Sequence, residues 1–214
     1  MKIDLHIHTA RSDGLDTPKE MVKGAIKKGL AGIAITDHDV PPPKITMRNF
    51  LIIPGVEVTT NKGHILLLGV YEIPPKNIDL FELIDFARER AYVIIPAHPY
   101  DIIRSGIGDL VKRIDCDAIE VINGGTIINY FNKKAKKVAE ELNKPMTGGS
   151  DAHYVEVIGS AFTIFQNPID DVDDALNAII KGEVRPYGKP YGIFPIIKLF
   201  VKRRLFSHSS NEFD

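Results

Sequence analysis

The feature that most constrains this chain is a series of short apolar runs that each end in histidine or acidic residues. The runs have the length of strands, and most are separated by stretches with a helical pattern. Strands that alternate with helices predict an α/β architecture with a largely parallel sheet. In such folds the carboxyl ends of the strands meet at one end of the molecule, where active sites gather. We therefore expect these polar side chains to converge.

The first run, Ile3 to His8, carries two histidines spaced two residues apart. In a strand such residues point to the same side, so His6 and His8 project together. A buried pair of imidazoles is costly without a partner, and a metal ion is its usual partner. Asp13, in the polar turn that follows, is a third candidate ligand.

Later runs add further candidates. Six of the seven histidines fall at predicted strand ends, and the seventh, His208, lies in a tail where we expect it to be solvated. The turn at 61–63 is too short for a parallel crossover, so the runs 51–58 and 64–69 are predicted to form a hairpin. The full set of candidate metal ligands is His6, His8, Asp13, His38, Glu57, His64, His98, Asp151 and His153.

This mixture of imidazoles and carboxylates suits Mn, Zn or Fe rather than Ca or Mg alone. Nine ligands exceed what one ion takes, so we expect two or three divalent ions. A site with several ions polarises a phosphoryl oxygen and activates water, which is hydrolytic chemistry on an anionic ester. The single cysteine, Cys116, precedes a predicted strand at the opposite end and is interpreted as structural.

The bulk properties are those of an ordinary globular domain. The chain has 214 residues, 44% hydrophobic residues and a formal net charge of −1, so we expect one domain with a barrel over about 1–182 and an amphipathic tail over 183–214. One cysteine, no signal peptide and no membrane span predict a cytoplasmic protein. We expect the basic tail to form a helix packed on the barrel, with a membrane-surface or partner contact as the alternative.

Several segments together resemble the PHP family, named for polymerase and histidinol phosphatase. They are Asp4-Leu-His-Ile-His-Thr9 with Ser12-Asp-Gly14, Thr36-Asp-His38, Pro54-Gly-Val-Glu57, Ala97-His-Pro99 and Gly149-Ser-Asp-Ala-His153. The resemblance implies a distorted (β/α)7 TIM-like barrel with a trinuclear site. It also implies three ligand groups: His6, His8, Glu57 and Asp151; Glu57, His64 and His98; and Asp13, His38 and His153.

The resemblance further implies a metal-dependent phosphoesterase, in which a metal-bridged hydroxide attacks phosphorus. Asp13, His38, Asp151 and His153 are the candidate catalytic residues, and Arg11 is a candidate phosphate clamp beside the site. The expected substrate is a phosphorylated small molecule or nucleotide, with a nucleic-acid substrate left open. No lid is evident, because the loops are short.

Two other functions remain as alternatives. The chain is either an enzyme of this kind or a non-catalytic metal-binding module that acts with a partner protein; the filled ligand set favours the enzyme. A metal-dependent amidohydrolase is the third hypothesis, and the lack of a lysine at a suitable strand end argues against it. The sequence does not indicate an oligomeric state.

Overall fold

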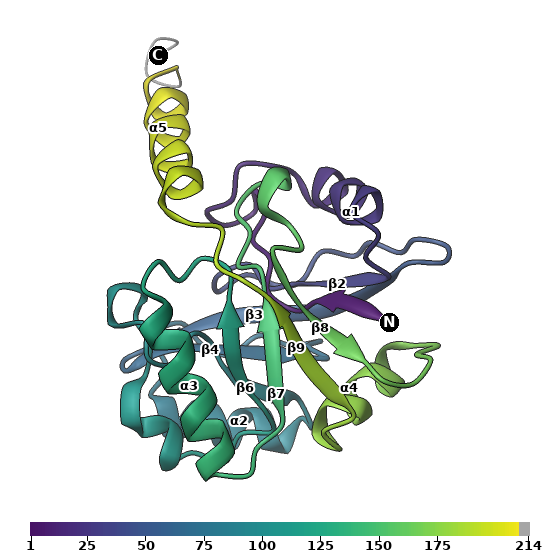
Figure 1. Ribbon diagram of the computed structural model, residues 1–214, viewed down its shortest axis with the longest axis vertical. Helices are drawn as coiled ribbons and strands as arrows, with labels where there is room; N and C mark the ends of the chain where they lie inside the picture. Colours follow the sequence, from purple (N-terminus) through teal and green to yellow (C-terminus); the bar gives the residue numbers. More distant parts are fainter. Residues whose placement is uncertain (210–214) are drawn as a thin grey trace.

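The computed structural model describes residues 1–209, without the side chains of Phe200, Lys202, Arg203 and residues 205–209. The prediction for His208 therefore lies outside the described side chains. A curled seven-stranded sheet forms most of the body, and a two-stranded sheet lies beside β8 and β9 (Figure 1). The strands are β1 (Lys2–Asp4), β2 (Gly32–Ile35), β3 (Leu51–Thr60), β4 (Gly63–Leu68), β5 (Val93–Pro96), β6 (Ile119–Asn123), β7 (Met146–Gly149), β8 (Ala161–Phe165) and β9 (Val184–Gly188).

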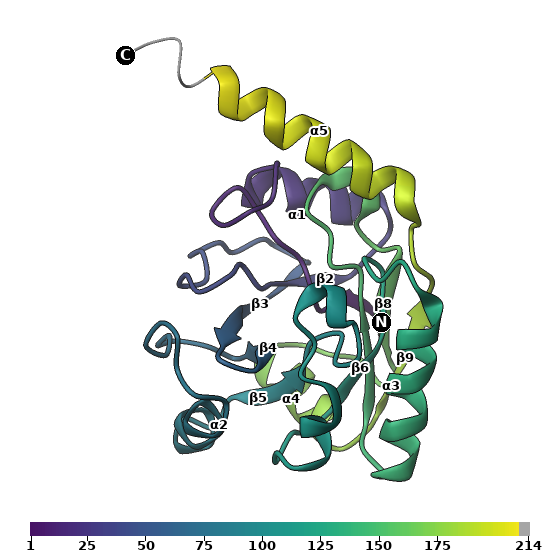
Figure 2. The same ribbon diagram turned by 90° about the vertical axis from the view of Figure 1, so that its left-hand side faces the viewer.

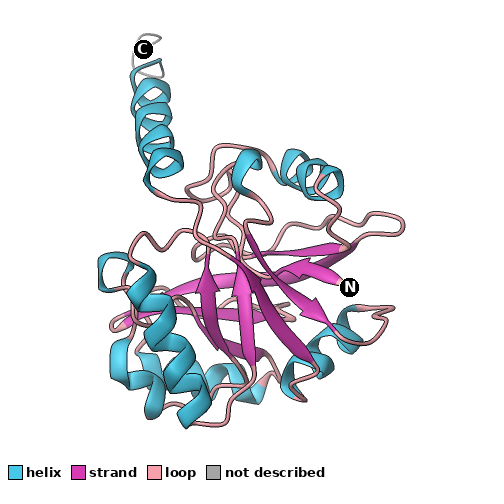
Figure 3. Cartoon of the chain, viewed as in Figure 1, coloured by secondary structure: helices cyan, strands magenta, loops and turns pink. Residues whose placement is uncertain are grey.

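The helices lie between the strands in sequence or follow them (Figure 3). They are α1 (Pro18–Lys27), α2 (Leu80–Glu89), α3 (Asn129–Glu141), α4 (Val172–Ile180) and α5 (Ile193–Ser209), with the 3-10 turns η1 (Ile102–Arg104), η2 (Gly108–Lys112) and η3 (Val155–Val157). Helix α1 begins as its sequence predicts. Thr17 caps it, and the Glu20 side chain accepts the Thr17 backbone N–H to complete a capping box.

The seven-stranded sheet has the order β5-β4-β3-β2-β1-β8-β9, and β6 pairs with β7. Only β1–β2 and β2–β3 are parallel in the large sheet, whereas the other four pairs are antiparallel. The prediction of a largely parallel sheet is therefore wrong. The predicted hairpin of β3 and β4 is confirmed, with Thr59 opposite His64 and Glu57 opposite Leu66.

The structure shows a mixed α/β fold with a curled half-barrel sheet, and not a regular (β/α)7 barrel. Helices make the crossover between parallel strands at only two places among the described residues, where α1 joins β1 to β2 and α3 joins β6 to β7. The physical reason lies in the connections: the tight turn before β4 reverses the chain, and a loop without a helix joins β2 to β3. The small sheet approaches the large one through side chains, because Thr163 of β8 exchanges hydrogen bonds with the backbone of Gly148 in β7.

An apolar core supports the end of the sheet where the candidate ligands gather. Residues 64, 66 and 68 of β4 share one face, so the face that presents His64 continues as Leu66 and Leu68. These leucines pack with Ile95 of β5 and with Ile179 of α4 in one buried cluster. Helix α4 thus closes the opposite end of the curled sheet from the candidate ligands.

The C-terminal tail differs from the prediction in two ways. It begins with β9, an edge strand that tolerates Pro186 because one of its edges needs no ladder partner. Helix α5 then packs on the body only through its first turns, where Leu199 joins a buried cluster, and the rest of the helix projects (Figures 1 and 2). Its apolar residues surround the helix, so only part of them can face the body, and Phe194 remains 81% exposed. None of the described helices combines the length and apolar character that a bilayer span requires.

Candidate metal centre

The first strand delivers two buried histidines to one place, although its ladder is shorter than predicted. Regular pairing of β1 ends at Asp4, and the chain continues extended, with the His8 N–H donating to the Ala152 carbonyl at 2.8 Å. His6 and His8 are fully buried, and their Nε2 atoms lie 3.1 Å apart. Two imidazoles at this separation need a shared partner for their lone pairs.

Glu57 of β3 lies at the centre of the cluster and is 1% exposed. Its carboxylate oxygens lie within reach of five imidazoles: His8 Nε2 at 3.0 Å, His6 Nε2 and His64 Nδ1 at 3.1 Å, His98 Nε2 at 3.2 Å and His38 Nε2 at 3.5 Å. One carboxylate thus lies beside five histidines from four different segments. This placement is what a ligand that bridges two ions requires.

Asp151 occupies the other side of the cluster and is fully buried. Its Oδ1 atom lies 3.4 Å from His8 Nε2 and 3.7 Å from His6 Nε2. The backbone of Asp151 is left-handed, with φ 54°, and that of His98 is also, with φ 31°. Non-glycine residues adopt this region at a cost, and such outliers cluster at functional sites.

A third part of the cluster lies nearer the surface. His153 Nε2 is 3.0 Å from Asp13 Oδ2, and Asp13 is the most open of these residues, with 38% of its side chain exposed. His8 Nδ1 lies 3.6 Å from Asp13 Oδ1. The ring of His8 stacks on those of His38 and His153, with centroids 4.6 and 4.3 Å away.

All nine predicted ligands therefore meet in one continuous cluster. Ligand atoms within 4.8 Å of one another form four overlapping sets: His8, Asp13, His38 and His153; His6, His98 and Asp151; His6, His8 and Glu57; and His38, Glu57 and His64. The first set contains the predicted Asp13 group with His8 added. His98, predicted to share an ion with His64, also lies with His6 and Asp151. Which residues hold which ion stays a prediction.

The buried polar atoms of this cluster fit a metal-binding role. Four ring nitrogens and one carboxylate oxygen are buried and lack a hydrogen bond within the described structure: Nδ1 of His8, His38, His64 and His98, and Oδ1 of Asp151. Buried polar atoms normally find partners, so a cluster of unsatisfied ones needs an explanation. Divalent cations that accept lone pairs from nitrogen and oxygen would satisfy this donor set.

Opposite charges shift the pKa values across the cluster. Burial disfavours the charged form of His6, but Asp151, Glu120 and Glu57 outweigh it and hold the pKa of His6 well above its usual value. Burial also opposes ionisation of Asp151, yet Arg104 and the histidines hold the pKa of its carboxyl well below the usual range. The carboxyls of this site are therefore ionised and available as ligands.

Glu120 of β6 is a functional residue that the sequence reasoning missed. Its Oε1 lies 3.0 Å from His6 Nδ1, and its Oε2 accepts from the His98 backbone N–H at 2.7 Å and from Asn123 Nδ2 at 2.9 Å. A carboxylate on the far nitrogen of a metal-binding imidazole fixes its tautomer and orientation. The available signal was a charged residue in the middle of an otherwise apolar strand.

Asn123, at the end of β6, both shapes the turn that follows and faces the site. Its Nδ2 donates to Glu120 and to Asp151 Oδ2 at 3.0 Å, and its Oδ1 accepts the Gly125 N–H at 2.9 Å. Asp37, next to His38, caps the loop after the first strand, because it accepts from the N–H and hydroxyl of Thr9 at 2.6 and 2.8 Å.

The arginine nearest the cluster is Arg104 of η1. Its guanidinium donates to Asn123 Oδ1 at 3.3 Å and forms an ion pair with Asp151 Oδ2 at 2.5 Å. Arg11, the predicted phosphate clamp, turns to the surface and donates to the Pro41 carbonyl at 2.9 Å. Arg104 lines the pocket above the cluster and Arg11 does not.

That pocket has a volume of about 340 Å³. Its floor consists of five candidate ligands, Asp13, His38, Glu57, His64, His98, together with His153 at the side. Its opposite wall includes Tyr191, Ile196 and Leu199, which come from the segment that begins α5. The sequence indicated no lid, yet the tail forms part of the pocket.

Comparisons with known proteins agree with this arrangement. Residues 129–184 match the family model described as PHP-associated. The uncharacterized protein MJ0417 of Methanocaldococcus jannaschii is 34% identical over 185 residues, which cover 81% of this chain and 75% of that protein. A crystal structure of a two-domain protein from Bacteroides vulgatus, which contains a predicted PHP-like metal-dependent phosphoesterase, superposes with a TM-score of 0.71 at 20% identity. It covers 88% of this chain and 65% of the other.

Two characterised relatives match part of the chain. The phosphoribosyl 1,2-cyclic phosphate 1,2-diphosphodiesterase of Eggerthella lenta is 33% identical over 84 residues, 34% of this chain and 32% of that enzyme. The 3',5'-nucleoside bisphosphate phosphatase of Chromobacterium violaceum is 35% identical over 83 residues, 34% of this chain and 29% of that enzyme. The matched regions thus cover about a third of each enzyme. With its clustered histidines and carboxylates and these relatives, the chain belongs to the PHP family of metal-dependent phosphoesterases.

Proposed function

We propose that this protein hydrolyses a phosphate monoester in the pocket above the candidate metal centre. The observation that carries the proposal is the single cluster of nine imidazoles and carboxylates, with unsatisfied ligand atoms, at the floor of a 340 Å³ pocket. A pocket of this size accommodates a small molecule. The relatives that act on phosphate esters support the same chemistry.

The candidate ligands differ in how deeply they are buried. His6, His8, Glu57 and Asp151 form the buried part, while Asp13, His38, His64 and His153 reach toward the pocket, with His98 between them. Two or three divalent ions held there would polarise the phosphoryl oxygens and lower the pKa of bound water. Mn, Zn and Fe suit this mixture of ligands.

The chain's own residues bind and orient the phosphate. Arg104 lies at the pocket wall with its guanidinium beside Asp151, so a phosphoryl oxygen entering the pocket meets a fixed cation next to the ligands. Asp13 and His153, 3.0 Å apart, lie at the more exposed side of the cluster, where they would hold an ion close to the entering phosphate.

The test is hydrolysis of p-nitrophenyl phosphate, and of bis(p-nitrophenyl) phosphate, by protein stripped of metal with EDTA and then reloaded with Mn²⁺. We expect turnover of the monoester that depends on metal, and its loss in the variants His38→Ala and Asp151→Asn. The matched control is Asp170→Asn, because Asp170 is an exposed loop aspartate. A folded, metal-loaded protein without turnover of either ester would refute the proposal and favour a metal-binding module that acts with a partner.

A preference for the diester over the monoester would move the proposal toward nucleic-acid or cyclic-phosphate substrates. The EDTA-treated sample separates this outcome from contamination by a metal-independent phosphatase. Circular dichroism of each variant shows whether a loss of turnover reflects lost chemistry or lost folding.

A further inference from the structure

The pocket above the metal centre has one wall of a different chemical character from its floor. The floor is histidine and carboxylate, whereas the wall consists of Ile103, Ile127, Tyr191, Ile196 and Leu199. These side chains come from three separate segments: η1, the loop before α3, and the start of α5. Three distant parts of the sequence therefore contribute apolar groups to the lining of one pocket.

Three isoleucine pairs show that this placement is selective. In each pair of adjacent isoleucines, one lines the pocket and the other does not: Ile103 beside Ile102, Ile127 beside Ile128, and Ile196 beside Ile197. Ile103 and Ile127 keep 66% and 43% of their surface exposed. Exposed apolar side chains are ordinary when scattered, but a group of them around one pocket marks a binding surface.

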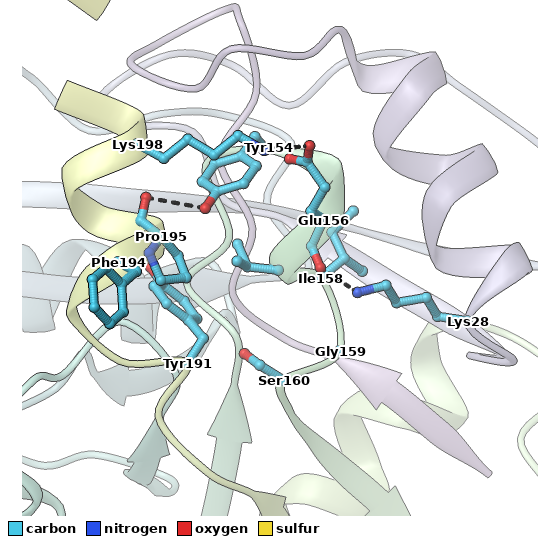
Figure 4. A pocket seen from close by; sticks show the side chains of 11 residues that line it. Lys28, Tyr154, Glu156, Ile158, Gly159, Ser160, Tyr191, Phe194, Pro195 and Lys198 are labelled. Atoms are coloured by element: carbon cyan, nitrogen blue, oxygen red, sulfur yellow. Dashed lines mark hydrogen bonds and ion pairs between the residues drawn. The ribbon is translucent and has the colours of Figure 1, made fainter. Parts of the chain in front are cut away.

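The start of α5 is fixed in place by contacts on its outer side (Figure 4). The Tyr154 hydroxyl donates to the Pro195 carbonyl at 3.0 Å, and Lys198 Nζ lies 2.7 Å from Glu156 Oε1. The Tyr191 N–H donates to the Gly124 carbonyl at 2.9 Å. Leu199 is 8% exposed and belongs to a buried core cluster. The wall is thus a preformed surface.

Beyond the candidate ligands, charge in the described pocket lining is confined to one side chain. Apart from the candidate ligands, Arg104 is the charged side chain among the described residues that line the pocket, and Ser105 and Gly125 complete the lining. Arg104 lies beside the ligands and is paired with Asp151, so it is placed for the scissile phosphate. A second phosphate, a carboxylate or an ammonium group on the leaving group would find no oppositely charged side chain among the described wall residues.

We propose that the apolar wall is the leaving-group subsite, and that the substrate is a compact phosphate monoester with an aromatic group close to the phosphate. This inference rests on the proposed function, which it deepens. An aromatic ring packs against the Tyr191 ring and the isoleucines, and so leaves the water that surrounds it. Esters of polyols or of charged alcohols would lose hydration there without new partners.

The test compares the binding of phenylphosphonate and methylphosphonate to the Mn²⁺-loaded protein by isothermal titration calorimetry. The two probes share a phosphonate and differ only in the apolar group, and neither is hydrolysed. We expect phenylphosphonate to bind at least about tenfold more tightly. Equal affinity within twofold would overturn the subsite.

Matched variants test whether the preference for phenylphosphonate over methylphosphonate arises at the wall. Ile196→Asn and Ile103→Asn are expected to reduce the preference to about twofold or less while methylphosphonate binds as before, whereas Ile197→Asn and Ile102→Asn, on the neighbouring residues, retain it. An equal loss in both members of a pair would overturn the assignment of the wall.

Hydrolysis of p-nitrophenyl phosphate by the same samples separates this inference from the function on which it rests. Turnover without a phenyl preference would overturn the subsite and leave the phosphoesterase standing. A phenyl preference without turnover of any ester would keep the apolar binding surface and overturn the hydrolytic function.

Discussion

The change Glu120→Gln tests whether the second layer of the candidate centre controls metal binding. The two carboxylate oxygens of Glu120 accept from opposite sides: Oε1 faces His6 Nδ1, and Oε2 accepts from the His98 N–H and from Asn123 Nδ2. A glutamine has one oxygen and one NH₂ group at these positions. Whichever way the amide turns, one side loses its acceptor.

Each orientation of the new amide has a defined cost. If the NH₂ faces the backbone of His98, two donors there lose their acceptor while buried. If it faces His6, the ring must accept at Nδ1 and carry its proton on Nε2, the atom that points to His8 and Glu57. An Nε2 that carries a proton cannot bind a cation.

We expect Glu120→Gln to weaken Mn²⁺ binding by about 10- to 100-fold, which equals about 1.4–2.7 kcal/mol. The assay is titration of the EDTA-stripped protein with Mn²⁺ by calorimetry. Glu140→Gln is the control, since this exposed helix residue only pairs with Lys136 at 3.9 Å. Mn²⁺ affinity within twofold of the wild-type protein, with the same stoichiometry, would refute the reasoning.

Three further predictions use other parts of the structure. Arg104→Met should raise the inhibition constant of inorganic phosphate at least about tenfold, while Arg11→Met, at the surface, leaves it within twofold; equal effects would contradict the placement of Arg104. Burial raises the pKa of the Cys116 thiol to about 11, so Ellman's reagent at pH 8 should modify it only as the protein unfolds, and rapid labelling of the native protein would oppose this. Tyr154→Phe removes the bond to the Pro195 carbonyl and should lower the phenylphosphonate preference without changing Mn²⁺ affinity, which the calorimetric titrations measure directly; an unchanged preference would show that this bond does not fix the wall.

Most candidate ligands could be found from sequence because they lie in or at an end of an apolar run; Asp13 was found from the polar turn after the first run. The position of a residue along a strand determines which face and which end of the sheet its side chain occupies. The end of a strand can be predicted from the local pattern of apolar and polar residues. Whether neighbouring strands run parallel or antiparallel was harder to predict. β8 and β9 run antiparallel to their neighbours, and no local pattern around Ala161 or Val184 distinguishes that arrangement from a parallel one.

Residues that act through long-range partners could not be assigned from sequence. Arg104 and Glu120 contact the ligands only because η1 and β6 fold against β1 and β7, at separations of more than forty residues. Arg11 lies next to a ligand motif but turns to the surface. Arg11 was therefore wrongly favoured because it lies close to a ligand motif in sequence. Arg104 was missed because it lies far in sequence from Asp151, the ligand that it contacts.

The order of the parts along the chain has a consequence for synthesis. Every candidate ligand lies between His6 and His153, and β8, the strand that pairs with β1, ends at Phe165. Tyr191 and the start of α5 follow later. A nascent chain therefore carries a full ligand set before Tyr191, Ile196 and Leu199 complete the apolar wall, so ions can enter an open site that the tail then narrows.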